Sequence, residues 1–166
     1  MIFFPFIAAK LETALSKDEV LTRLNALIGE ETTTDQVDLN GLKRFSYTGQ
    51  VANDTFALRR KINYNNSFLP QLQGQLIESG NAIRVELNLS LLTYVKRIMV
   101  LLMTLPYVVV LLLTWFGANA DGFQLELLMP LVMPLVIYGV GTIAFKLESR
   151  KAVDDLQQLL NATILS

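Results

Sequence analysis

Two long apolar runs, joined by a short polar segment, constrain the fold of this chain more than any other feature. The first run, residues 98–116, reads IMVLLMTLPYVVVLLLTWF and has no charge, and the second, residues 125–145, has one charge at its start, Glu126. A helix over 98–116 is roughly 28 Å long, close to the hydrocarbon thickness of a bilayer. Neither run has the polar stripe of a helix on a soluble core. We therefore expect two antiparallel transmembrane helices.

Composition agrees with a membrane component and removes several classes of function. Hydrophobic residues make up 52% of the chain, and mean hydropathy is +0.40. Cysteine and histidine are both absent, which excludes disulfides, Cys or His metal sites and the commonest catalytic base near neutral pH. The 14 Lys and Arg against 15 Asp and Glu give no argument for nucleic acid binding. We expect no enzyme activity, no cofactor and no metal.

The basic residues predict the orientation in the membrane. Lys96 and Arg97 precede the first run, and basic residues follow the second. Asp121 is the only charged residue in the loop between the runs. By the positive-inside rule, both termini and the polar region lie in the cytoplasm. The N-terminal MIFFPFIAAK has no basic stretch and too short an apolar run for a signal peptide. We expect a bacterial inner (plasma) membrane protein with both termini cytoplasmic.

The polar region begins with an amphipathic helix. Ser16 followed by Glu19 forms a capping box, and apolar residues with helical spacing predict a helix over 17–28. The polar segment 30–40 has no periodicity and is expected to be a loop.

A two-residue period then predicts an antiparallel β-meander. Alternating apolar residues and turn signals place four strands, near residues 45–51, 56–64, 70–76 and 83–89. The N-terminal residues have extended character and could add a fifth strand, which Pro5 would place at an edge. The apolar face is expected to be covered by the first helix and by a second amphipathic helix over 147–160.

The expected fold is therefore α+β, a meander of four to five strands covered by two amphipathic helices, with an inserted two-helix transmembrane hairpin. The boundaries place a cytoplasmic domain at 1–92 together with 146–166 and the hairpin at 93–145.

Arg60 is the first candidate for a binding residue, because alternation places it on the apolar face of its strand. In a structural interpretation, its guanidinium reaches water or a carboxylate such as Glu86. In a ligand interpretation, it holds an anionic head group or carboxylate, with Tyr47 and Tyr64 as hydrogen-bond donors. Both interpretations remain open at the level of sequence.

Gly74 is the second candidate, since a glycine in the middle of a strand leaves a gap on the apolar face. Close approach of a helix or a bound ligand would account for the gap, and we favour the helix.

Basic residues flank the apolar runs and form the membrane-surface candidates. They are Lys96, Arg97, Lys146, Arg150 and Lys151. Topology alone requires such residues, and contact with anionic lipid is the alternative.

The pattern F-x-L-x-R-x-I-x-Y-x-N-S-F-L-P-x-L-x-G-x-L, residues 56–76, resembles a signature of small uncharacterised bacterial two-span membrane proteins. The resemblance implies an inner-membrane protein with this architecture and carries no activity. In that family an arginine precedes the Asn-Ser-Phe-Leu-Pro run, whereas this chain has Asn65 there, so any role of that arginine does not transfer.

Two functions follow as hypotheses. The first is a membrane-anchored, non-enzymatic scaffold or accessory subunit, which presents a small cytoplasmic domain at the inner leaflet to a membrane-protein partner or to a second copy. The alternative is a lipid or amphiphile binder with an apolar pocket that contains Arg60.

Overall fold

The computed structural model describes residues 4–28, 47–116 and 129–165, apart from positions 63, 65 and 81. Six strands and three helices are present in these ranges. In chain order they are β1 (Phe6–Thr13), α1 (Lys17–Ile28), β2 (Tyr47–Val51), β3 (Thr55–Arg60), β4 (Gln71–Ser79), β5 (Ala82–Ser90), α2 (Thr93–Phe116), α3 (Met129–Leu160) and β6 (Thr163–Leu165). The expected α+β class is confirmed.

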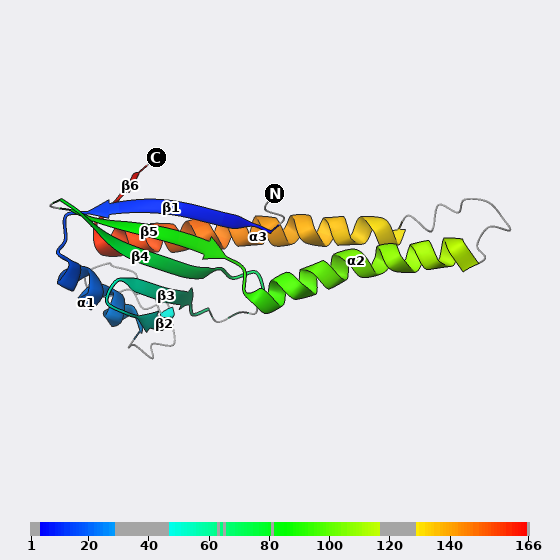
Figure 1. Cartoon of the computed structure of the whole chain (residues 1–166), viewed down its shortest axis with the longest axis horizontal. Helices are drawn as coiled ribbons and strands as arrows, with labels where there is room; N and C mark the ends of the chain where they lie inside the picture. The colour runs from blue at the N-terminus through cyan, green and yellow to red at the C-terminus, as the bar shows by residue number, and fades with distance from the viewer. Residues whose placement is uncertain are drawn as a thin grey trace.

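The strands form one antiparallel sheet in the order β2-β3-β4-β5-β1-β6 (Figure 1). β2 to β5 are the predicted meander, and their register places Arg60 opposite Tyr47 and Gly74 opposite Phe56. β1 lies between β5 and β6, so the edge position predicted for it is wrong. Pro5 is compatible with the inner position because it precedes the strand and takes no place in its ladder.

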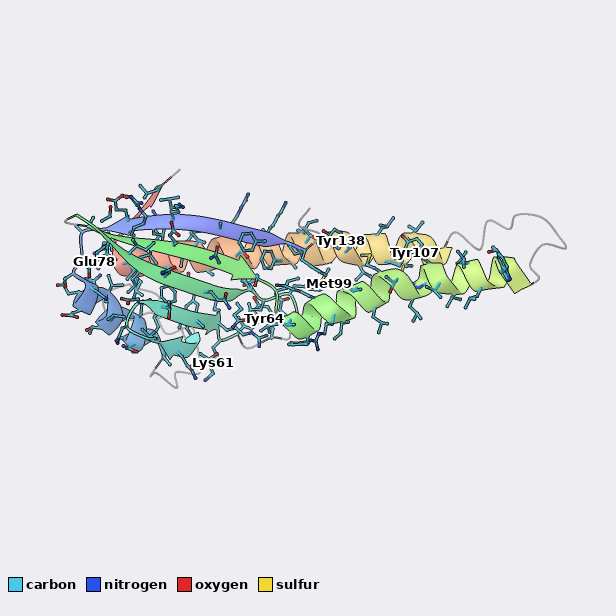
Figure 2. The ribbon with its side chains drawn as sticks, in the orientation of Figure 1. Lys61, Tyr64, Glu78, Met99, Tyr107 and Tyr138 are labelled. Atoms are coloured by element: carbon cyan, nitrogen blue, oxygen red, sulfur yellow. The ribbon has the colours of Figure 1, made fainter. Side chains whose placement is uncertain are left out.

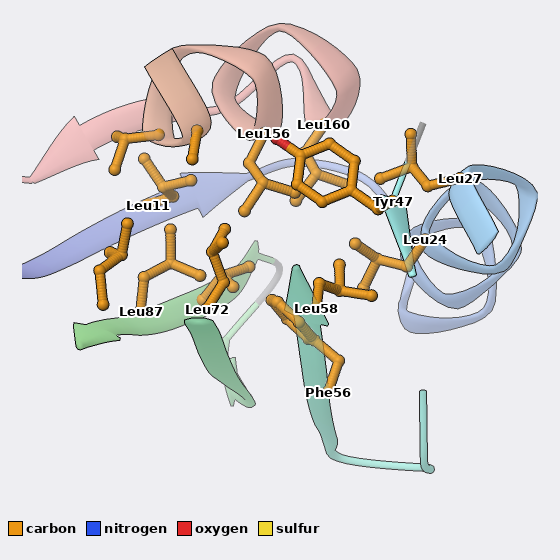
Figure 3. Close-up of a cluster of buried hydrophobic side chains, with 14 of the residues drawn as sticks. Leu11, Leu24, Leu27, Tyr47, Phe56, Leu58, Leu72, Leu87, Leu156 and Leu160 are labelled. Carbon is orange, nitrogen blue, oxygen red and sulfur yellow. The ribbon is translucent and has the colours of Figure 1, made fainter. Parts of the chain in front are cut away.

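α1 and the C-terminal half of α3 cover one face of the sheet, as predicted (Figure 3). Leucines of both helices meet leucines of the central strands, and many of these side chains are almost fully buried. Examples are Leu11, Leu24, Leu72, Leu89, Leu156 and Leu160, each 0% exposed. Leu58 and Leu87, 1% exposed each, belong to the same packed layer.

The predicted capping box starts α1. The Ser16 backbone N–H donates to Glu19 Oε2 at 2.9 Å, and the Glu19 N–H donates to Ser16 Oγ at 3.4 Å. The Ser16 N–H and the Ser16 hydroxyl both donate to Glu19 Oε2, and these two bonds lower the pKa of the Glu19 carboxyl. The predicted helix over 17–28 is confirmed.

α3 is one helix across the point where two helices were predicted. It runs without interruption from the apolar run into the amphipathic segment, so the predicted domain boundary at 145/146 falls inside it. Asn161 ends it in a left-handed conformation (φ 46°), and Thr13 Oγ1 donates to the Leu160 carbonyl at 2.7 Å. β6, which no pattern predicted, follows directly.

α2 and the first half of α3 lie side by side beyond the end of the sheet (Figure 1). Both helices are long and apolar enough to cross a membrane, by length and composition, over Thr93–Leu112 and within Val132–Leu160. Their large apolar side chains face outward, with Leu111 64% and Ile143 61% exposed. Several predictions, including the loop 30–40, the loop with Asp121, and positions Asn65 and Glu126, lie outside the described residues.

Candidate functional site

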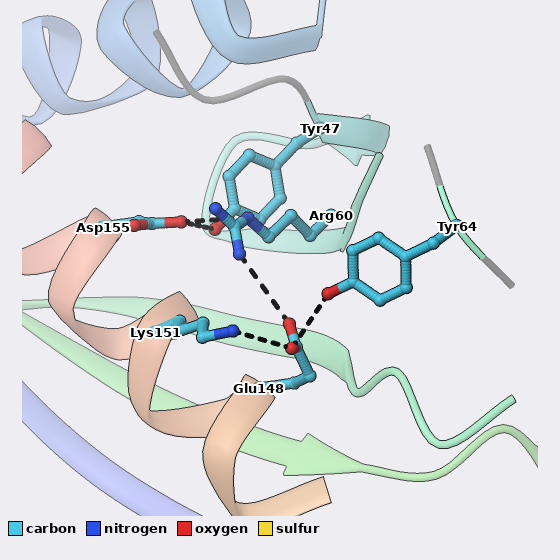
Figure 4. A network of polar contacts seen from close by, with 6 residues as sticks. All are labelled: Tyr47, Arg60, Tyr64, Glu148, Lys151 and Asp155. Atoms are coloured by element: carbon cyan, nitrogen blue, oxygen red, sulfur yellow. Dashed lines mark hydrogen bonds and ion pairs between the residues drawn. The ribbon is translucent and has the colours of Figure 1, made fainter. Parts of the chain in front are cut away.

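A cluster of six polar residues lies between the sheet and α3, and we call it the polar cluster (Figure 4). Its members come from β2, β3, the segment after β3, and two turns of α3. They are Tyr47, Arg60, Tyr64, Glu148, Lys151 and Asp155. Arg60, Tyr47 and Tyr64, which the sequence suggested as a ligand site, therefore lie close together. Three residues of α3 join them.

Arg60 bridges two carboxylates of α3. Its Nε lies 3.4 Å from Asp155 Oδ2, and its Nη1 lies 3.7 Å from Glu148 Oε2. Both carboxylate side chains are buried, while the Arg60 side chain is 22% exposed. Buried carboxylates need opposite charge nearby, and Arg60 supplies it. The structural interpretation of Arg60 is therefore supported.

The partner named for that interpretation, Glu86, is wrong. Glu86 points to the opposite face of β5 and pairs with Lys10 at 2.9 Å. Asp155 is buried against Tyr47 and Arg60.

Tyr47 closes the inner end of the cluster. Its hydroxyl donates to Asp155 Oδ2 at 2.8 Å, and the side chain is almost fully buried. Burial and the adjacent Asp155 charge raise the pKa of the Tyr47 phenol well above its ordinary range. Tyr47 therefore acts as a neutral hydrogen-bond donor.

Tyr64 and Lys151 close the outer end. The Tyr64 hydroxyl donates to Glu148 Oε1 at 3.0 Å, and Lys151 Nζ lies 3.0 Å from the same oxygen. Partial desolvation of the hydroxyl and its bond to Glu148 raise the pKa of Tyr64. Tyr64 was expected inside a strand, whereas β3 ends at Arg60 and the Tyr64 ring is exposed.

The chemistry of the polar cluster is that of an anchor. Two carboxylates meet two cations and two phenols, so each carboxylate has an opposite charge and a hydrogen-bond donor. Within the described ranges, no group of three His, Cys, Asp or Glu side chains could hold a metal ion. The contacts join strands β2 and β3 to α3 over two helical turns.

Gly74 has a different explanation from either of those first considered. A Cβ at this position would lie 2.0 Å from Cζ of Phe56, the residue opposite it on β3. The Phe56 ring therefore covers the glycine across the strand pair, in the arrangement known from aromatic residues over sheet glycines. The helix expected to fill this gap does not fill it.

Gly141, on α3, is a second glycine that is covered by an aromatic ring. A Cβ on Gly141 would lie 2.5 Å from the Phe68 ring. Phe68 belongs to the Asn-Ser-Phe-Leu-Pro segment, where Asn66 Oδ1 accepts from the Phe68 N–H at 2.9 Å and Leu69 is buried. The segment therefore packs a phenylalanine against the apolar half of α3. Gly141 therefore allows this loop residue to pack closely against the helix.

The membrane-surface candidates separate into two groups. Arg97, Lys146 and Arg150 are exposed and Lys96 is half-buried, all near the apolar parts of α2 and α3. Lys151 instead reaches Glu148 and belongs to the polar cluster.

Sequence reasoning missed Glu148, Asp155 and the pair of Phe68 with Gly141. Glu148 and Asp155 are seven residues apart, two helical turns, so they share a helix face. That spacing could have revealed both carboxylates as one pair. It would have done so only if the helix had been predicted to continue through residue 146.

No family model matches the sequence, and no curated protein matches it. Among solved structures, the chain is similar to the "Solution structure of the Aha1 dimer from Colwellia psychrerythraea", with 17% sequence identity and a TM-score of 0.35. The match covers 70% of this chain and 98% of that chain. A likeness at this level carries no argument about function.

Proposed function

We propose that this protein is a membrane-anchored, non-enzymatic scaffold or accessory subunit. It holds a small α+β domain at the cytoplasmic face of a bacterial inner membrane, where that domain binds a membrane-protein partner or a second copy. One observation carries the proposal: α3 is a single helix whose first half is apolar and exposed and whose second half is built into the core of the sheet domain.

The exposed apolar surface supports the membrane position. Outward leucines and valines continue along α2 and the first half of α3, and a contiguous apolar surface of this size is unfavourable in water. Where α2 meets the sheet domain, Val95 and Met99 turn inward and belong to its buried core. The hairpin that we propose places this junction at the inner leaflet, with the basic residues of both helices on the same side.

The contacts between the sheet domain and α3 support a scaffold role. The polar cluster and the contact of Phe68 with Gly141 fix the sheet to α3 at separate points along the helix. A domain held in this way has a defined orientation to the bilayer, which suits the presentation of a binding surface and not a search on a flexible tether.

The alternative, an apolar pocket gated by Arg60, receives less support. The side chains that would line it, among them Leu72, Leu89 and Leu156, are fully buried against one another. The Arg60 guanidinium is engaged by Glu148 and Asp155, so an anionic ligand would have to displace both carboxylates.

Affinity purification tests the proposal. A tag after Ser166, chemical cross-linking in intact membranes and extraction in mild detergent precede mass spectrometry. We expect one partner, or a second copy of the chain, in near-stoichiometric amount. An unrelated two-span protein expressed and cross-linked in parallel controls for abundance. Recovery of phospholipid with no protein partner would favour the lipid-binding alternative and contradict the scaffold.

A further inference from the structure

An open hollow of about 500 Å³ lies outside the polar cluster, between β3, the segment after it and the start of α2. Its lining is mainly polar and includes Thr48, Arg59, Lys61, Asn66, Ser67 and Tyr94. In Figure 2 the labelled Lys61 and Tyr64 lie close to the end of the sheet domain from which α2 begins. The hollow therefore opens at the junction of the sheet domain with the apolar helices.

The charge of this hollow is positive. Arg60 contributes to the lining, but Glu148 and Asp155 balance its charge. Arg59 and Lys61 remain, and the described lining residues include no Asp or Glu. Arg59 Nε is buried and has no hydrogen-bond partner among the described residues. A guanidinium nitrogen without a partner can gain a hydrogen bond when the side chain turns toward an anion in the hollow.

The depth of the hollow relative to the bilayer suits a lipid head group. Tyr94 lines the hollow in the first turn of α2, and the exposed apolar surface begins at Ile98, about 6 Å further along the helix. Lipid phosphates lie just outside the hydrocarbon region, where tyrosine is also enriched.

We propose that the hollow binds the phosphate of an anionic phospholipid, with Arg59 as the main ligand. The Arg59 guanidinium matches two phosphate oxygens, Lys61 adds a second positive charge, and the Ser67 and Tyr94 hydroxyls can donate further hydrogen bonds. This inference rests on the proposed membrane position and adds a lipid class to it.

Native mass spectrometry of lipid retention tests the proposal. The full chain is reconstituted in nanodiscs with equal amounts of dioleoyl-phosphatidylglycerol and dioleoyl-phosphatidylcholine, and lipid retained after detergent release is counted. We expect one phosphatidylglycerol per chain to be retained in clear preference to phosphatidylcholine. Lys61→Gln should reduce the preference about fivefold, and Arg59→Gln should abolish it.

The matched control is Lys96→Gln with Arg97→Gln, which removes two basic residues near the membrane from outside the hollow. This variant should keep the retained phosphatidylglycerol. Circular dichroism checks that each variant folds, and the exposed Lys61 provides a test even if the Arg59 variant does not fold. Suppose that the control loses as much phosphatidylglycerol as the Arg59 and Lys61 variants. The lipid would then be held by general attraction to basic residues near the membrane, and the proposed site would be overturned.

Inorganic phosphate distinguishes the two sources of the anion. Millimolar phosphate should leave the retained lipid in place, and complete displacement would indicate a site for free phosphate compounds and overturn the lipid assignment. A wild-type chain that inserts in the membrane without any preference would overturn this inference alone. Recovery of the chain in the soluble fraction would instead overturn the proposed function on which it rests.

Discussion

Replacing Arg60 distinguishes a structural role in the polar cluster, which we call an anchor, from a role in ligand binding. In Arg60→Met the buried Glu148 and Asp155 lose the cation between them, and we expect a loss of about 2 kcal/mol in the free energy of unfolding, reduced by the partial exposure of Arg60. Thermal and denaturant unfolding in detergent, followed by circular dichroism, measures this loss. The exposed neighbour Lys61→Met should change stability by less than about 0.5 kcal/mol. Equal losses in the two variants would contradict the anchor.

Tyr47 predicts how stability depends on alkaline pH. Its pKa in the folded protein is raised above the ordinary value of 10.0, so the folded state keeps a proton that the unfolded chain releases. The free energy of unfolding should therefore fall as the pH rises above about 10, by up to about 1.4 kcal/mol per pH unit from this group. Tyr47→Phe should flatten the slope, because it removes the buried phenol. An unchanged slope in Tyr47→Phe would show that the phenol is not buried in the folded state.

Gly74 predicts a cost for a single methyl group. The Cβ of Gly74→Ala would overlap the Phe56 ring, and overpacking of this kind costs about 1–3 kcal/mol. Adding Phe56→Leu should recover part of the loss, because the smaller side chain leaves room. Unfolding measurements on both single variants and the double variant give the coupling. A neutral Gly74→Ala would mean that Phe56 does not cover the glycine.

At this scale the sequence identifies the unusual residues but not their partners. Strand alternation places Arg60 on the covered face and requires a partner for it. The same alternation, applied to β5, turns Glu86 away, because Val85 and Leu87 face the core. The true partners lie on α3, which is remote in sequence, and no local pattern reports which helix face meets which strand.

At the scale of elements, α3 connects the apolar helices to the sheet domain, and its Gly141 makes room for Phe68. Gly141→Ala should push the Phe68 ring away and destabilise the protein by about 1–2 kcal/mol. Gly139→Ala is the matched control, since a Cβ there meets nothing within 4 Å, and it should be neutral or slightly stabilising. Combining Gly141→Ala with Phe68→Ala should cost less than the sum of the two. Full additivity would contradict the contact.

Local patterns predict α1 and the four-strand meander because each has a capping signal or a clear two-residue period. β6 has three residues and no period of its own, and the inner position of β1 depends on pairing with strands remote in sequence. The change from apolar to amphipathic character near residue 146 suggests two helices. Since no glycine or proline stands between Phe145 and Leu147, nothing there ends the helix, and α3 continues.

At the scale of the whole molecule, one rod-like structure has two parts with different surfaces, one suited to water and one suited to lipid (Figure 1). Polar side chains such as Lys10 and Glu86 line the open face of the sheet, while leucines and valines line the helices beyond it. The proposed scaffold role requires that the sheet domain faces the cytoplasm and that the apolar helices lie in the bilayer.

Cysteine labelling measures this arrangement most directly, because the chain has no cysteine of its own. Asn88→Cys places one thiol on the exposed face of β5, and Asn119→Cys places one between the apolar runs. In intact bacterial spheroplasts, a membrane-impermeant maleimide should label Asn119→Cys at once and Asn88→Cys only after lysis. Labelling of Asn88→Cys before lysis with protection of Asn119→Cys, or recovery of the chain in the soluble fraction, would contradict the account.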